Sequence, residues 1–144
     1  MSTVFTRIIN GEIPGRFIWS DEHCVAFLTA GPITPGHTLV VPRDEITQWT
    51  EATPELIAHL TDVAHTIGKA IQTEWGSPRI GLLAQGFEVP HLHLHVWAAY
   101  STKDFDLSAV DDSPDPAMMD QAAQRLRNRL HTQLEGIPTA THIA

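Results

Sequence analysis

The segment 91–97 (HLHLHVW) places three imidazoles at alternate positions, separated by apolar residues. Strict alternation of polar and apolar residues is typical of a half-buried strand, whose side chains point to opposite faces in turn. We therefore predict a strand here, with Leu92, Leu94 and Val96 toward the core and the three histidines on the other face. Imidazole donates, accepts or carries a proton near neutral pH, so this face is a candidate for metal binding or for catalysis.

A single metal ion fits the full set of histidines poorly. Zinc needs ligand nitrogens at about 2.0–2.1 Å, whereas His91 and His95 would lie about 13 Å apart at Cα on an extended strand. The ring of His93 would also stand between them. Two adjacent histidines with a third ligand from elsewhere could still hold a metal, and a polar strand face rich in histidine is the third alternative. Catalysis by one nucleophile or base between two proton-managing groups fits the spacing better.

The pattern His-x-His-x-His-x-x with apolar x resembles that of the histidine triad (HIT) family of nucleotide hydrolases and transferases, in its Hint-like bacterial branch. The segments 5–14 (FTRIINGEIP), 25–28 (VAFL) and 35–42 (PGHTLVVP) are similar to that family as well, so the resemblance covers most of 4–97. It implies an α+β fold of HIT type, with an antiparallel sheet of about five strands and one long crossover helix. It also implies cleavage at the α-phosphate of a nucleotide.

The resemblance assigns roles to four histidines. His93 would be the nucleophile that forms a nucleotidyl-histidine, His95 would contact the phosphate and the leaving group, and His91 and His37 would support the pocket. For the distal nitrogen of His93 to attack, its other nitrogen should be protonated and held by a backbone carbonyl. No metal or cofactor is required. The residues expected to contact the substrate are Phe27, Thr29, Gly86, Phe87, Glu88 and Val89.

The chain departs from the family pattern where the nucleotide would be recognised. Thr29 stands where the family usually has an Asp for the ribose hydroxyls, and Phe87 where it usually has Gln. Glu88 replaces a small polar residue, and Ile80 lies near the place of an Asn. We therefore expect phosphate chemistry to be retained and nucleoside recognition to be altered. A nucleotide-binding regulatory module with little turnover and a metal-dependent hydrolase are the alternatives.

Composition narrows the class of protein. The net charge of −8 argues against a nucleic-acid polymer as partner, because such binding depends on clustered Lys and Arg. No apolar run is long enough to cross a membrane, and residues 1–10 lack the pattern of a signal peptide. The chain has a single cysteine, Cys24, and so cannot form an internal disulfide, which favours a reducing cytoplasm. We expect Cys24 to be a small buried hydrophobic residue. The resemblance also implies a homodimer.

The length of 144 residues predicts one domain, 1–144, with a core over 4–100 and a helical extension over 113–136. We predict a helix or turn over 4–10 and strands over 16–20, 24–29, 37–41 and 79–84. A helix begins at Thr53-Pro54 and ends at Gly76, with His59 and His65 on its solvated face. A last helix begins at Ser113 or Asp115 and presents an apolar stripe of Met119, Ala123, Leu126, Leu130 and Leu134.

Overall fold

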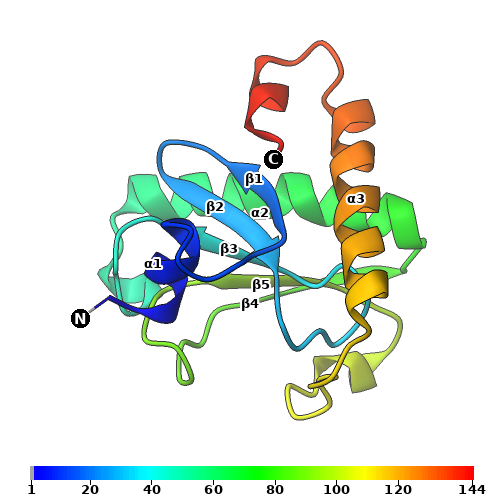
Figure 1. The fold of residues 1–144 in the computed structure, drawn as a ribbon, viewed down its shortest axis with the longest axis horizontal. Coiled ribbons are helices and arrows are strands. Elements are labelled where there is room, and N and C mark those ends of the chain that lie inside the picture. Colours follow the sequence, from blue (N-terminus) through cyan, green and yellow to red (C-terminus); the bar gives the residue numbers. More distant parts are fainter. Residues whose placement is uncertain (1) are drawn as a thin grey trace.

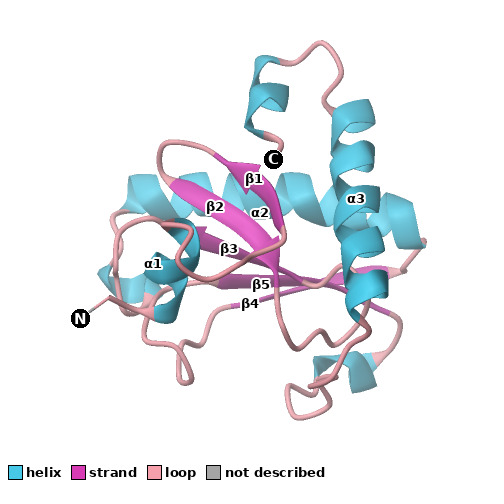
Figure 2. Cartoon of the chain, viewed as in Figure 1, coloured by secondary structure: helices cyan, strands magenta, loops and turns pink. Residues whose placement is uncertain are grey.

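One antiparallel sheet organises residues 2–144, which are the residues described by this computed structural model (Figures 1 and 2). The elements are α1 (Val4–Ile9), β1 (Phe17–Ser20), β2 (Cys24–Leu28), β3 (Thr38–Pro42), α2 (Pro54–Trp75), β4 (Arg79–Leu83), β5 (Leu94–Ala99) and α3 (Pro116–Gln133). The strand order is β1-β2-β3-β5-β4, with every neighbouring pair antiparallel. The helix α2 is the crossover that carries the chain from β3 to β4, as predicted.

The helix α2 forms where its sequence signals predicted it. The Thr53 hydroxyl caps the first turn by accepting a hydrogen bond from the Leu56 amide, and Pro54 occupies the first turn. Gly76 ends the helix with a left-handed φ of 64°. Figure 1 shows α2 running behind the sheet, and its buried side chains pack there: Leu60, Val63, Ala64, Ile67, Gly68, Ala70 and Ile71.

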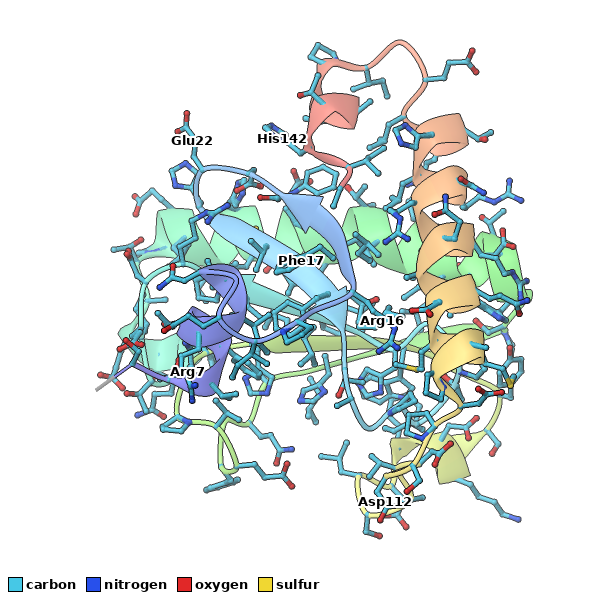
Figure 3. All side chains as sticks on the ribbon, viewed as in Figure 1. Arg7, Arg16, Phe17, Glu22, Asp112 and His142 are labelled. Atoms are coloured by element: carbon cyan, nitrogen blue, oxygen red, sulfur yellow. The ribbon has the colours of Figure 1, made fainter. Side chains whose placement is uncertain are left out.

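The C-terminal helix α3 packs against α2 and β1. Asp115 caps it through the Ala117 amide, and all five residues of the predicted apolar stripe are buried. Arg16, labelled in Figure 3 beside this helix, forms an ion pair with Asp120 at 2.8 Å. Beyond α3, a bridge between Ile143 and Trp19 covers part of the outer strand β1.

The two faces of the sheet are used differently. In β2, Cys24, Ala26 and Leu28 belong to the large core that packs against α2 and α3. Val25 and Phe27 point the other way, into a smaller apolar cluster with residues of α1 and β3. The period-two alternation of a strand produces this division. The histidine pocket lies on the side of the smaller cluster.

The strand predicted over 91–97 begins later than expected, at Leu94. The first rung of its ladder with β3 joins Val40 and Leu94. Before that point the backbone is curled, because the amide of His91 donates to the carbonyl of Val89 at 2.8 Å. The prediction of three parallel imidazoles on one extended segment was therefore wrong for the first of them.

Within residues 2–144, the helices are all too short or too polar to span a lipid bilayer.

Candidate active site

A pocket of about 410 Å³ opens on the α1 side of the sheet, between β2, β5 and the loop that precedes β5. Three of the four predicted histidines and all six residues expected to contact substrate line it: His37, His93, His95, Phe27, Thr29, Gly86, Phe87, Glu88 and Val89. A larger and more open hollow, of about 690 Å³, lies between β1 and α3 and contains none of these histidines. Three of the four histidines of the predicted site therefore share the smaller pocket.

His37 and His95 form a hydrogen-bonded pair whose protonation can be deduced. The backbone amide of Ile33 donates to His37 Nδ1 at 3.0 Å, so Nδ1 is the unprotonated nitrogen and Nε2 carries the hydrogen. His37 Nε2 lies 3.0 Å from His95 Nδ1 and must donate to it. In neutral His95 the hydrogen is then on Nε2, which is buried and has no hydrogen-bond partner within residues 2–144. This nitrogen is a donor without an acceptor on the wall of the pocket.

His37 is held in place by the glycine before it. Gly36 has a φ of 87°, a conformation that other L residues rarely adopt. A Cβ atom at this position would also lie 2.6 Å from the ring of Trp75. The turn into β3, and with it the direction of the His37 ring, depends on both features.

His93 is fixed in the complementary state. Its Nδ1 lies 2.7 Å from the carbonyl oxygen of His91 and therefore donates to it. The lone pair of neutral His93 is then on Nε2, the distal nitrogen. The rings of His93 and His95 have centroids 4.9 Å apart, and Phe5 of α1 packs edge-on against His93 at 4.8 Å.

Burial keeps these imidazoles neutral. Loss of solvent lowers the pKa of His37 to about 3, and the neighbouring His95 and His93 add to the effect. Burial, followed by the nearby His93, lowers the pKa of His95 to about 4. Burial also lowers the pKa of His93, against the opposing effects of the His91 carbonyl and the Glu88 carboxylate. At neutral pH the pocket thus presents a lone pair on one ring and an N–H on the next.

His91 does not line the pocket but anchors the segment that carries His93. It is fully buried, and its Nε2 donates to the carbonyl of Pro42 at 2.8 Å. Its Nδ1 accepts from the Thr3 hydroxyl at 2.6 Å. Thr3 and Thr6 of the N-terminal segment are also hydrogen bonded to Glu45, so α1 is tied to the loop after β3. The supporting role predicted for His91 is therefore exerted from behind the site.

The rim of the pocket carries a hydroxyl on one side and an aromatic ring with a carboxylate on the other. The Thr29 hydroxyl accepts from the Gly31 amide at 3.3 Å, which leaves its own hydrogen free for a ligand. Phe87 is 90% exposed and Glu88 is exposed, both on the loop that precedes β5. A nucleotide in the pocket would meet a hydroxyl, an aromatic ring and a carboxylate at its edge.

A known protein family matches most of this chain. The sequence matches the HIT domain over residues 10–102, more than half of the chain. The chain belongs to the HIT domain family. It is therefore placed among nucleotide-binding hydrolases and transferases, which is the broad class that the triad pattern predicted.

Individual HIT relatives extend over most of the chain. The protein named Protein hit from Bacillus subtilis is 34% identical over 106 residues, 70% of this chain and 73% of that protein. Adenylylsulfatase HINT3 from Arabidopsis thaliana is 31% identical over 98 residues, 65% of this chain and 50% of that protein. A solved zinc-bound histidine triad family protein from Mycobacterium smegmatis has a TM-score of 0.78 and 28% identity, covering 92% of this chain and 96% of that one. The predicted HIT-type α+β fold is confirmed.

Sequence reasoning missed three contributors to the HIT pocket. Thr3 and the backbone amide of Ile33 fix the tautomers of His91 and His37, and Phe5 packs on His93. Thr3 could have been recognised as a helix N-cap from its residue type and its place before the apolar segment 4–10. In the structure its hydroxyl accepts from the Thr6 amide. Nothing in the sequence pairs it with a histidine 88 positions away.

Proposed function

We propose that the protein is a nucleotide hydrolase or transferase that cleaves at an α-phosphate through a covalent nucleotidyl group on His93. One observation carries the proposal: two adjacent rings present complementary distal nitrogens. His93 has its lone pair on Nε2 because Nδ1 donates to a carbonyl, and His95 has an unpartnered N–H on Nε2. The first suits a nucleophile and the second suits a donor to phosphoryl oxygen.

The reaction follows from these two atoms. The lone pair on His93 Nε2 forms a bond to the α-phosphorus, and the bond from phosphorus to the leaving group breaks. The leaving group departs with the electron pair and takes a proton from solvent. The modified ring is cationic, and the His91 carbonyl, 2.7 Å from Nδ1, stabilises it. His95 Nε2–H meets the negative charge that develops on the phosphoryl oxygens.

Water completes the cycle by attacking the same phosphorus. The bond between phosphorus and Nε2 breaks, the attacking water gives up a proton to solvent, a nucleoside monophosphate leaves, and neutral His93 is restored. Nucleoside phosphoramidates, AMP esters and dinucleotides all contain the required α-phosphate with a displaceable group. The relative named adenylylsulfatase supports an adenylyl group as the transferred unit.

Trapping the intermediate tests this proposal directly. The full-length protein is exposed briefly to adenosine 5′-phosphoramidate in EDTA, quenched, and digested for mass spectrometry. We expect a mass increase of one adenylyl group on the peptide that contains His93, and complete loss of turnover in His93→Ala. His131→Ala, which replaces an exposed histidine of α3, serves as the matched control and keeps activity. Unchanged turnover in His93→Ala would rule out the nucleophile.

The same experiment separates the alternatives. Nucleotide binding without turnover or adduct would favour a regulatory module, the function suggested by Thr29 and Phe87. Activity that is lost on chelation and restored by zinc would favour a metal-dependent hydrolase. The engagement of His37 and His95 with each other argues for the metal-free mechanism, because a shared metal would have to break that pair.

Residues 1–144 are proposed to act as one domain, since α3 packs on both α2 and β1. A homodimer is proposed through β4, the outer strand on its side of the sheet, where Leu82 is 56% exposed. Sedimentation of the full-length protein tests the dimer: a monomer at micromolar concentration would reject it.

A further inference from the structure

A second group of reactive side chains lies on the opposite face of the sheet from the histidine pocket. Asp21 and Cys24 flank the turn of the β1–β2 hairpin, whose tip carries Glu22 in Figure 3, and His59 faces them from α2. Asp21 Oδ2 is 2.8 Å from His59 Nε2 and 3.6 Å from Cys24 Sγ. Among residues 2–144, this is the group of three potential ligands whose donor atoms all lie within 4.8 Å of one another.

The spacing of the three atoms is close to that of a coordination site. Ligands at zinc distances of about 2.0–2.3 Å, in tetrahedral array, are separated from one another by about 3.3–3.8 Å. The contact between Cys24 and Asp21 is already in that range, and the contact between Asp21 and His59 would open by less than one ångström. The third pair, Cys24 Sγ and His59 Nε2, lies within 4.8 Å, so α2 and the hairpin would have to approach each other by about one ångström at most to surround an ion.

Hydrogen bonds fix the orientation of the Asp21 carboxylate, as they commonly do for carboxylates that bind metals. Its Oδ1 accepts from the backbone amides of His23 and Cys24, and its Oδ2 accepts from the Trp19 indole at 2.8 Å. The cost of burying this carboxylate is offset by these three hydrogen bonds and by a fourth with His59. The group is thus a fixed anion beneath the surface.

The Cys24 thiol points at the carboxylate of Asp21. It is fully buried, and its Sγ lies 3.6 Å from Asp21 Oδ2. The thiol donates to the same oxygen that His59 contacts. One divalent ion could replace the proton on Cys24 Sγ and the proton on His59 Nε2, and so bind both side chains.

We propose that Asp21, Cys24 and His59 form a binding site for Zn²⁺ or a similar borderline-soft divalent ion. Sulfur, nitrogen and oxygen donors together favour this class of ion over Mg²⁺ or Ca²⁺. Cys24 Sγ, His59 Nε2 and Asp21 Oδ2 are the protein ligands, and water completes the tetrahedron. On binding, Cys24 releases its proton to solvent, and His59 moves its hydrogen from Nε2 to Nδ1. The side chain of His59 is 32% exposed, which provides the route for the ion.

This site is independent of the proposed reaction. Cys24 belongs to the core that packs against α2 and α3, whereas His93 lies with Phe5 on the other face. An ion here would join the β1–β2 hairpin to α2. The proposed effect of the ion is to stabilise the packing of the hairpin on α2. The metal site therefore does not depend on whether His93 is a nucleophile.

Cobalt(II) tests the site without any assay of activity. The full-length protein is reduced, freed of metal with a chelator, and titrated anaerobically with Co²⁺. We expect a sulfur-to-cobalt charge-transfer band in the near ultraviolet that saturates at one equivalent and is removed by Zn²⁺. Because the chain contains one cysteine, such a band identifies Cys24 as a ligand.

Variants decide whether the other ligands are correct. Cys24→Ser should abolish the band, and His59→Gln, at a partly exposed position, should weaken cobalt binding by at least about tenfold. His65→Gln replaces an exposed histidine of the same helix and should bind as the unaltered protein does. His93→Ala should also keep the band. Absence of the band in the unaltered protein, or full affinity in His59→Gln, would overturn the proposal.

Discussion

Replacing His37 by Gln should make the stability of the protein less sensitive to acid. In the folded state burial lowers the pKa of His37 from 6.5 to about 3. Below pH 6.5 the unfolded chain therefore binds a proton that the folded chain does not bind. The stability contributed by neutral His37 is fully present above pH 6.5, and is lost as the pH falls from 6.5 toward 3.

The size of the effect follows from this shift. Between pH 7 and pH 5, protonation of a normal histidine in the unfolded state lowers the free energy of unfolding by about 2 kcal/mol. Folded His37 stays neutral over this interval and offers no compensation. The loss of stability from pH 7 to pH 5 should therefore be about 2 kcal/mol smaller in His37→Gln than in the unaltered protein.

Urea unfolding at the two pH values measures this difference for both proteins. The comparison cancels the cost of the substitution itself, because only the change with pH is used. His131→Gln is the control and should keep the pH dependence of the unaltered protein. Equal acid sensitivity in His37→Gln would mean that His37 titrates normally in the folded state. The conclusion that burial keeps His37 neutral below pH 6.5 would then be wrong.

Three further predictions concern residues around the site. Thr3→Val removes the hydroxyl that caps α1 and binds His91, and should lower the free energy of unfolding by about 1–2 kcal/mol in urea titration. Gly81→Ala would place a Cβ atom 2.4 Å from the Trp97 ring and should destabilise by about 1–3 kcal/mol; an unchanged melting temperature would contradict this packing. Glu88→Gln should raise kcat/KM by about two- to fivefold for nucleotides with anionic leaving groups, relative to cationic ones. If the ratio of kcat/KM for anionic and cationic leaving groups did not change, the Glu88 carboxylate would be too far from the bound leaving group to interact with its charge.

Much of the fold could be predicted from local patterns. Thr53, Pro54 and Gly76 set the ends of α2, because helix caps depend on residues within a few positions of one another. The alternation over 91–97 predicted the strand that became β5, and the triad with PGHTLVVP identified the family. These features depend on neighbouring residues alone, so they are readable from the sequence.

The sequence determined which side chains are available, but only the tertiary structure decided what each histidine does. His91, His93 and His95 look equivalent along the chain. The Thr3 hydroxyl and the Pro42 carbonyl turn His91 away from the pocket, and the two partners come from distant segments. His59 was predicted to be solvated, yet the hairpin places the Asp21 carboxylate 2.8 Å from its ring. An imidazole takes its protonation and its role from partners within hydrogen-bond distance, and chain folding alone brings such partners together.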